Sequence, residues 1–127
     1  MWLRHNEAMS PMIQPPNSVL LLVGREEFTP PDTFAGRTCV ATHDCVAVGV
    51  LSEADGPTSV TLTPAADTAH LAMIGEFTIE SEGLLSLRDV YSREYDAMGV
   101  EVGRVHVTVW ADDVSEPGEV TFLVGHS

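Results

Sequence analysis

The sequence contains no lysine, and its basic side chains are six arginines set against 19 carboxylates in 127 residues. The formal net charge of −13 at pH 7 argues against nucleic-acid binding, because neutralising backbone phosphates requires many basic side chains. Without lysine, the chain can have neither a Walker-type phosphate loop nor a Schiff-base lysine. The acidity has two interpretations: background composition, or an acidic face that attracts a basic protein.

Long hydrophobic runs are also absent. The only strongly apolar run, Val19–Val23, is far too short to span a bilayer. The segment before it has neither the long apolar core nor the small-residue cleavage site of a signal peptide. We therefore expect no membrane partner and a cytoplasmic location. Residues 1–16 are predicted to be a flexible leader, and 17–127 a single domain.

Cysteine is scarce as well, since Cys39 and Cys45 are the only two. In a reducing cytosol they are expected to be free thiols, with a redox disulfide as the alternative. The spacing Cys39-x3-His43-x-Cys45 offers three candidate zinc ligands. No CxxC pair or second His/Cys cluster completes a site, so we expect no metal and no cofactor.

The dominant pattern in the chain is alternation of apolar with polar or small residues at a period of two. This pattern is typical of sheets with one buried face, and the valine- and threonine-rich composition suits strands. The sequence predicts an all-β fold, a single antiparallel β-sandwich of about seven to nine short strands. The apolar positions of the alternating runs are Val46, Val48 and Val50; Val60 and Leu62; Phe77 and Ile79; Val105, Val107 and Val109; Val120, Phe122 and Val124.

Turn residues divide these runs. Asp55-Gly56-Pro57 and Glu116-Pro117-Gly118 are each predicted to close a hairpin. The stretch 84–98 has two interpretations. Its apolar residues recur every three to four positions, as on one face of a short helix ending at Gly99, but they also fit a strand followed by a loop.

Two surface regions are candidate protein-binding sites. Residues 88–96 form the densest polar and aromatic stretch, and tyrosine and arginine are enriched in interface hot spots. His106 and Trp110 lie out of phase with the buried valines of their strand and would form an outward stripe with Thr108. Self-paired charges and an ordinary solvent face are the alternatives. The predicted partner-binding residues are Arg88, Tyr91, Arg93, Tyr95, His106 and Trp110.

Catalytic signatures are missing from the sequence, which has no GxGxxG, HExxH or GxSxG motif. The sequence therefore favours a non-enzymatic protein and predicts no catalytic residue. One alternative is a small-ligand-binding or enzymatic sandwich with a pocket near His43, Cys45 and His106. A second is a structural module that self-associates, and the sequence does not specify an oligomeric state.

The C-terminal half resembles a known family. The resemblance is carried by the run Phe77–Leu84, by Ser92-Arg93 and by the run Gly103–Trp110. These segments resemble the C-terminal strands of the small acidic inhibitors of competence-associated DNA-entry nucleases. The resemblance implies a β-sandwich that binds and inhibits a nuclease, and it assigns no inhibitory residue here. The predicted function is an acidic protein-binding module that inhibits a basic protein such as a nuclease.

Overall fold

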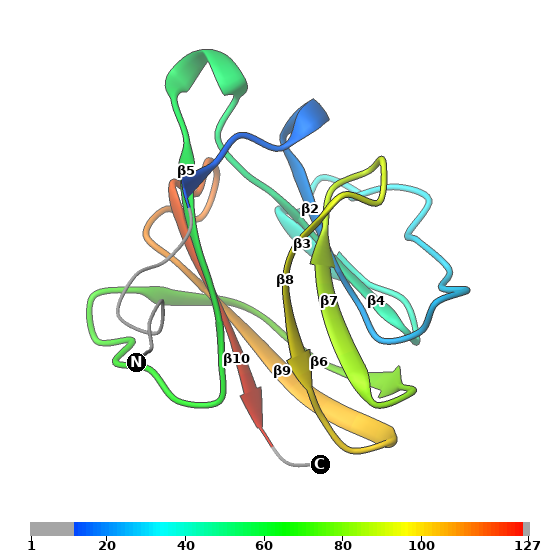
Figure 1. The fold of residues 1–127 in the computed structure, drawn as a ribbon. Helices are drawn as coiled ribbons and strands as arrows, with labels where there is room; N and C mark the ends of the chain where they lie inside the picture. Colours follow the sequence, from blue (N-terminus) through cyan, green and yellow to red (C-terminus); the bar gives the residue numbers. More distant parts are fainter. Residues whose placement is uncertain (1–11, 126–127) are drawn as a thin grey trace, which may run out of the picture.

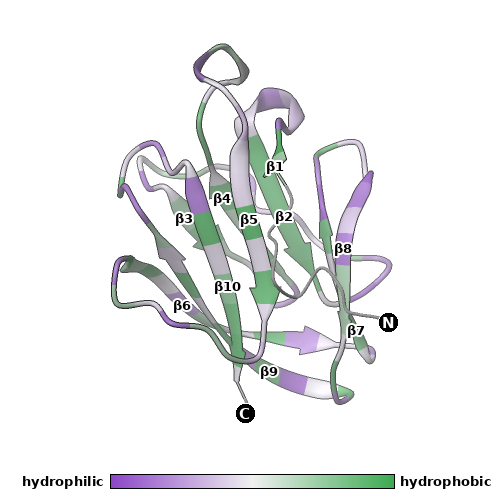
Figure 2. Cartoon of the chain, turned by 60° about the vertical axis from the view of Figure 1, so that its left-hand side comes forward, coloured by the Kyte–Doolittle hydropathy of each residue, from purple (hydrophilic) through white to green (hydrophobic). Residues whose placement is uncertain are grey.

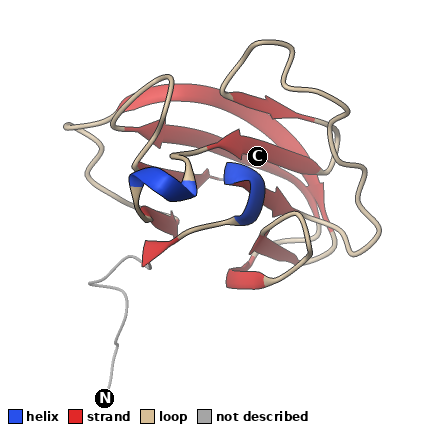
Figure 3. Ribbon diagram, turned by 90° about the horizontal axis from the view of Figure 1, so that it is seen from above, coloured by secondary structure: helices blue, strands red, loops and turns tan. Residues whose placement is uncertain are grey.

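Two five-stranded sheets pack face to face (Figure 1). The computed structural model describes residues 12–125. The β10 sheet has the order β1 (Met12–Ile13), β5 (Thr58–Thr63), β10 (Glu119–Gly125), β9 (Gly103–Ala111) and β6 (Ala72–Ser81). The β2 sheet has the order β3 (Cys39–Ala41), β4 (Cys45–Gly49), β2 (Val19–Val23), β7 (Leu84–Arg88) and β8 (Glu94–Gly99). Two short 3-10 helices, η2 (Pro16–Ser18) and η3 (Glu53–Asp55), lie in the connections, and Figure 3 shows both layers from above.

The predicted all-β sandwich is confirmed, with two differences. Residues 12–125 form ten strands, more than the seven to nine predicted. The strands β1 and β3 were not predictable, because they are only two and three residues long and carry no alternating run. The sandwich is also not wholly antiparallel, since β10 pairs with β5 in parallel, from Glu119 opposite Ser59 to Leu123 opposite Thr63. Alternation shows which side chains share a face, but it does not specify the neighbour of a strand or its direction.

The core between the sheets is built from the alternating residues. Val105, Val107 and Val109 of β9 face inward and are almost fully buried, together with Phe122 of β10. The β2 sheet contributes the second and fourth residues of its strands β2, β4 and β7, whose side chains point inward. These are mainly Leu20, Leu22, Val46, Val48, Leu85 and Leu87.

Strand β2 is buried on both faces, which explains its uninterrupted apolar sequence. Leu20 and Leu22 enter the main core, while Leu21 and Val23 point to the outer face of the β2 sheet. There they form a second cluster with Cys45 and Ala47, covered by Phe28 and Phe34 of the connection between β2 and β3. Figure 2 shows β2 as hydrophobic along its length, whereas β10 carries alternating bands.

The two predicted hairpins have different outcomes. Glu116-Pro117-Gly118 does join the antiparallel neighbours β9 and β10, as predicted. The prediction of a hairpin at Asp55-Gly56-Pro57 is wrong, because β4 and β5 belong to different sheets and this segment connects one sheet to the other. Gly and Pro mark a change of chain direction, but they do not determine whether the flanking strands pair.

The stretch 84–98 is an antiparallel hairpin of β7 and β8, so the helix interpretation is wrong. The strand-plus-loop interpretation is right for the strand at its start, but the predicted loop contains a second strand, β8. Leu84 pairs with Gly99 and Leu87 with Asp96, and the register shifts by one residue between Leu87 and Arg88. Leu85 and Leu87 have a period of two and are both buried in the core. Pairing with β2 and β8 thus overrides the helical spacing of the more exposed residues.

The predicted leader, residues 1–16, lies mostly outside the described residues. Its described part includes β1, which pairs with β5 through Met12 opposite Ser59 and Ile13 opposite Thr58. Ordered pairing therefore starts ahead of Asn17, where the sequence placed the beginning of the domain. Within residues 12–125, no helix is long and apolar enough to cross a membrane.

Gly24, directly after β2, provides a test of this packing. A Cβ there would lie 2.0 Å from the carbonyl oxygen of Glu80, a backbone atom that cannot move without shifting β6. We expect Gly24→Ala to lower the free energy of unfolding by about 2–3 kcal/mol, the cost of overpacking. Gly99→Ala is the matched control, since its Cβ would meet nothing within 4 Å. Equal unfolding midpoints in urea for the two variants would contradict the close approach.

A candidate protein-interaction surface

The turn between β7 and β8 is organised by one buried carboxylate. Asp89 is 3% exposed, and its Oδ1 accepts hydrogen bonds from the backbone N–H groups of Tyr91 (2.8 Å) and Arg93 (3.1 Å). Its Oδ2 accepts a hydrogen bond from the hydroxyl of Tyr95 at 2.8 Å. Ser92 has a φ of 65°, which lets the chain reverse within this short turn. The fixed turn presents Tyr91, which is 75% exposed.

These contacts also determine the ionisation of Asp89. Burial disfavours the charged form, but the hydrogen bonds from Tyr95, Arg93 and Tyr91 and the charge of Arg93 outweigh burial. The pKa of Asp89 is therefore lower than its ordinary value. The carboxylate stays ionised at neutral pH, as an acceptor of three hydrogen bonds must.

The hairpin residues predicted to contact a partner differ in their availability. The Arg88 side chain is 12% exposed; its Nε donates to Ser86 Oγ at 2.8 Å and its Nη2 lies 3.3 Å from Glu26 Oε1. Tyr95 donates a hydrogen bond from its hydroxyl to Asp89, and its ring packs against the main core. The Arg93 guanidinium lies 5.6 Å from the Tyr95 ring centre and remains exposed. Arg88 and Tyr95 thus support the hairpin, while Tyr91 and Arg93 face solvent.

His106 and Trp110 lie on β9 of the other sheet, on its outward face. His106 Nε2 is 2.8 Å from Glu76 Oε2 on the paired strand β6. The Trp110 indole N–H donates to the Thr108 hydroxyl at 2.9 Å, and the ring is half-buried. The six predicted residues therefore form two separate groups, one on the hairpin of the β2 sheet and one on the outer face of the β10 sheet.

The alternative pocket near His43, Cys45 and His106 is not formed. Cys45 is fully buried in the outer cluster of the β2 sheet, and the His43 side chain is 53% exposed. His106 faces outward from the opposite sheet. Side chains on the outer faces of two stacked sheets cannot line one cavity.

The two cysteines are separate free thiols. Cys39 lies in the core between the sheets, whereas Cys45 lies in the outer cluster, so the β3–β4 hairpin separates their side chains. This placement is incompatible with the redox disulfide considered from the sequence. Burial raises the pKa of the Cys39 thiol to about 12. Burial, reinforced by the charge of Asp44, raises the pKa of Cys45 to about 12 as well.

A hollow of about 350 Å³ lies beside the hairpin, between the β2–β3 connection and the outer face of the β2 sheet. Its wall is mainly apolar, and Val90 of the β7–β8 turn borders it. The principal lining residues are Val19, Leu21, Phe28, Phe34, Ala47 and Val90, with Asp32 as the charged member. Sequence reasoning missed this hollow, although two of the four phenylalanines stand in a proline-containing polar loop, a signal of a loop that covers apolar surface.

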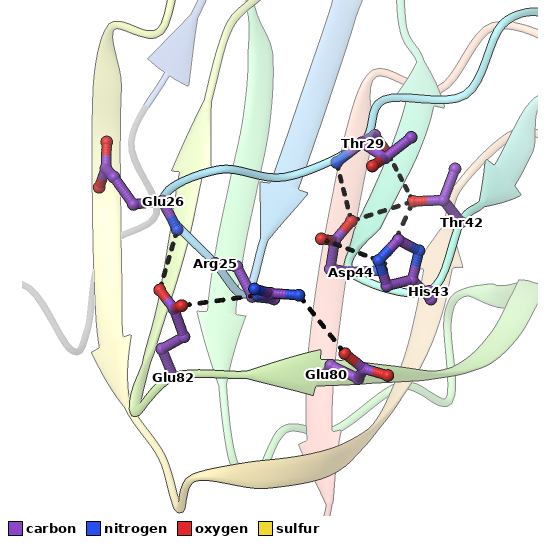
Figure 4. Close-up of polar contacts among 8 residues, drawn as sticks. All are labelled: Arg25, Glu26, Thr29, Thr42, His43, Asp44, Glu80 and Glu82. Carbon is purple, nitrogen blue, oxygen red and sulfur yellow. Dashed lines mark hydrogen bonds and ion pairs between the residues drawn. The ribbon is translucent and has the colours of Figure 1, made fainter.

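The β2–β3 connection is held in place by Asp44, which is 0% exposed (Figure 4). Its Oδ1 accepts a hydrogen bond from the backbone N–H of Thr29 at 2.9 Å, and its carbonyl accepts one from Gly24 N–H at 3.0 Å. The Thr42 hydroxyl donates to the carbonyl of Thr29 and lies 3.3 Å from Asp44 Oδ1. His43 Nε2 is 3.3 Å from Asp44 Oδ2 but lacks the alignment of a hydrogen bond.

A second, weaker tie holds the start of this connection. Arg25 lies between two carboxylates, with Nε 3.5 Å from Glu82 Oε2 and Nη1 3.7 Å from Glu80 Oε1 (Figure 4). Glu82 Oε1 also accepts the backbone N–H of Glu26 at 3.1 Å. Each of these groups is more than a third exposed, so the ion pairs contribute little compared with the buried Asp44 contacts.

A larger hollow, of about 540 Å³, opens at the end of the sandwich where β8, β9 and β10 approach. Met98, Val100 and Val124 line it together with Arg104 and Glu101, and none of the predicted site residues is among its lining residues. Within residues 12–125, no group of three or more His, Cys, Asp or Glu side chains is arranged to hold a metal ion.

Comparison with known proteins gives a similarity at the level of the fold. No protein-family model and no curated protein sequence matches the chain. The structure is similar to the crystal structure of ComJ, inhibitor of the DNA degrading activity of NucA, from Bacillus subtilis. The TM-score is 0.60 at 10% sequence identity, and the similarity covers 91% of each chain. This supports the β-sandwich of the predicted family, and at such low identity it shows the fold alone.

Replacing Asp44 tests the attachment of the connection. We expect Asp44→Ala to lower the free energy of unfolding by about 1.5–3 kcal/mol, because it removes the charged acceptor of the Thr29 N–H, and hydrogen bonds to charged groups are the stronger ones. The amide of Thr29 should exchange with solvent faster in the folded variant. The control is Glu27→Ala, an exposed carboxylate of the same connection, which should change stability by less than about 0.5 kcal/mol. Unchanged exchange at Thr29 would contradict the role of Asp44.

Replacing Asp89 gives a pH-dependent result. The folded-state pKa is lowered, so the ionised carboxylate contributes stability above its ordinary pKa and loses it as pH falls through the folded value. We expect Asp89→Asn to cost about 1–2 kcal/mol at neutral pH, with the difference from wild type shrinking in acid. Urea unfolding at a series of pH values measures this. Tyr95→Phe, which removes one of the three donors to Asp89, should lower the free energy of unfolding by less than Asp89→Asn does. A stability difference between Asp89→Asn and wild type that does not change with pH would contradict the role of the ionised carboxylate.

Proposed function

We propose that this chain is a non-enzymatic acidic protein that binds a basic protein partner and inhibits it, the partner being a nuclease. The observation that carries the proposal is the similarity to ComJ across 91% of both chains, because ComJ is described as an inhibitor of the DNA degrading activity of NucA. Fold similarity by itself does not transfer function, so the proposal also depends on the surface chemistry of this chain.

The charge supports a basic partner. With 19 carboxylates against six arginines, and with most carboxylates of the described residues exposed, the surface attracts cationic proteins. Complementary charge accelerates association and suppresses wrong partners more than it adds affinity. The two unpaired cysteines are compatible with a reducing compartment, and we place the protein in the cytoplasm on that ground.

The hairpin group supplies the contact residues in this proposal. Tyr91 is the most exposed aromatic side chain of the described residues, and it is held on a turn fixed by Asp89. Because the backbone of the turn is already fixed, only the side-chain torsions of Tyr91 need to be ordered on binding, which makes it a suitable interface anchor. Arg93 lies beside it, whereas Arg88 and Tyr95 position the turn. His106 and Trp110 are too far around the sandwich to share a contact of this size and form the comparison group.

The test is inhibition of DNA degradation. The chain is used to capture proteins from its native lysate at low ionic strength, and the retained fraction is assayed for DNA-degrading activity with and without added chain. We expect a nuclease to be retained, to be inhibited on addition of the chain, and to be released as salt rises, because charge attraction is screened. Tyr91→Ala should weaken inhibition about tenfold or more, and the control His106→Ala should weaken it less than about twofold.

Two results would refute the proposal. One is a retained fraction without any DNA-degrading activity that the chain suppresses. The other is binding of equal strength at low and high salt, which would remove the basis for a basic partner. If His106→Ala proved as harmful as Tyr91→Ala, the inhibitory contact would have to be moved to the outer face of the β10 sheet.

A further inference from the structure

We propose that the hollow beside the β7–β8 turn is the socket for one large apolar side chain of the partner, flanked in the partner sequence by lysine or arginine. This inference rests on the proposed function, which it deepens by naming the chemistry that the partner presents. The partner is thus recognised through a cationic segment with an apolar anchor.

The size and lining of the hollow fit a side chain. Its volume of about 350 Å³ is large enough to hold one aromatic side chain. Phe28, Phe34 and Val19 form apolar walls, and Leu21 and Ala47 form the floor on the outer face of β2 and β4. Only Asp32 and Thr33 add polar side chains, so there is little to orient a small polar ligand.

The setting of the hollow points to a polypeptide. Val90 borders the hollow and is 37% exposed. Tyr91, the proposed anchor residue, follows it directly in the sequence, so the hollow lies next to the proposed contact residues. An exposed tyrosine next to an apolar socket resembles a binding hot spot, in which a pocket receives a partner side chain at the centre of the contact.

The charge around the hollow selects the residues that flank the anchor. Asp32 lines it, and Glu26 and Glu27 are exposed carboxylates on the same β2–β3 connection. The arginines of this region point elsewhere: Arg25 lies between Glu80 and Glu82, Arg37 lines a different hollow with Met73 and Val114, and Arg88 lies 3.3 Å from Glu26. Asp32 is the only charged residue that lines the hollow, so a cationic segment is attracted there, whereas an acidic segment would be repelled.

The hollow is also pre-formed. Asp44 and Thr42 fix the connection at Thr29, between Phe28 and the two prolines, and Arg37 N–H donates to the carbonyl of Phe34 at 2.9 Å. The opposite rim is fixed by Asp89 through the turn that carries Val90. A socket with both rims held in place costs little ordering entropy when a side chain enters.

The first experiment uses a defined probe and does not need the natural partner. The probe is the capped pentapeptide Arg-Lys-Phe-Lys-Arg, compared with the same peptide carrying serine in place of phenylalanine. Methyl NMR of the full chain should show saturable shifts at Val19, Leu21 and Val90 with the phenylalanine peptide. The serine peptide should bind at least about tenfold more weakly. Equal binding of the two peptides, or shifts confined to other methyl groups, would overturn the proposal.

Variants separate the socket from general charge attraction. Val90→Asn makes one wall polar without changing the charge, and Val102→Asn, at a 78% exposed valine before β9, is the matched control. We expect Val90→Asn to weaken the phenylalanine peptide about five- to tenfold and Val102→Asn to leave it within about twofold. Ala47→Leu, which fills the floor, should act like Val90→Asn if its spectrum shows a folded protein. If both Val90→Asn and a folded Ala47→Leu bind as the control does, the socket is refuted.

The same variants distinguish this inference from the proposed function. If the chain inhibits the captured nuclease and Val90→Asn inhibits as well as Val102→Asn, the socket is wrong and the proposed function stands. If the phenylalanine peptide occupies the hollow but no nuclease is inhibited, the proposed function fails while the hollow remains a site for cationic segments with an apolar anchor.

Discussion

The arrangement of one side of this sandwich depends on the hydrogen bonds of Asp44. A fully buried carboxylate is costly, and here Oδ1 accepts the amide N–H of Thr29, whereas Oδ2 has no hydrogen-bond partner and lies 3.3 Å from His43 Nε2. The backbone carbonyl of Asp44 also accepts the amide N–H of Gly24. These bonds hold the β2–β3 connection against the outer face of the β2 sheet, where Phe28 and Phe34 cover Leu21 and Val23. The outer cluster, the hollow and one rim of the candidate interaction surface all follow from this attachment.

The two outer faces of the sandwich consequently have different properties. The β2 sheet is covered by a loop, so its outward residues are apolar and its surface is a shaped hollow beside a rigid turn. The outward face of the β10 sheet is more polar: it carries the paired Glu76 and His106 and the hydroxyl of Thr108, together with Trp110 and Leu123. Exposed apolar surface adjoins this hollow at Val90 and Tyr91.

The sequence was sufficient to predict the fold class, because alternation reports burial of one face directly, as Val105, Val107 and Val109 illustrate. It could not assign partners to strands. Asp55-Gly56-Pro57 resembles a hairpin turn but connects strands of different sheets, and no residue pattern near β5 or β10 indicates that they pair in parallel. The polar stretch 88–96 did not distinguish the exposed Tyr91 from Tyr95, which packs against the core. The hollow was not, because it forms from residues between positions 19 and 90 that only the tertiary structure brings together. The internal roles of Arg88 and Tyr95 likewise depend on contacts with Glu26 and Asp89.

The parallel pairing of β5 with β10 has a consequence for biosynthesis. β10 is translated after the other strands of residues 12–125, yet it is the central strand of its sheet, and β5 has only the two-residue β1 as its other neighbour. Until residues 119–125 leave the ribosome, β5 and β9 lack the strand that pairs with both of them, and the core lacks Val120, Phe122 and Val124. Folding that requires such distant contacts is slow and begins late. The nascent chain thus emerges with β5 and one side of β9 lacking their partner strand, and its high density of like charge then keeps neighbouring unfinished chains apart.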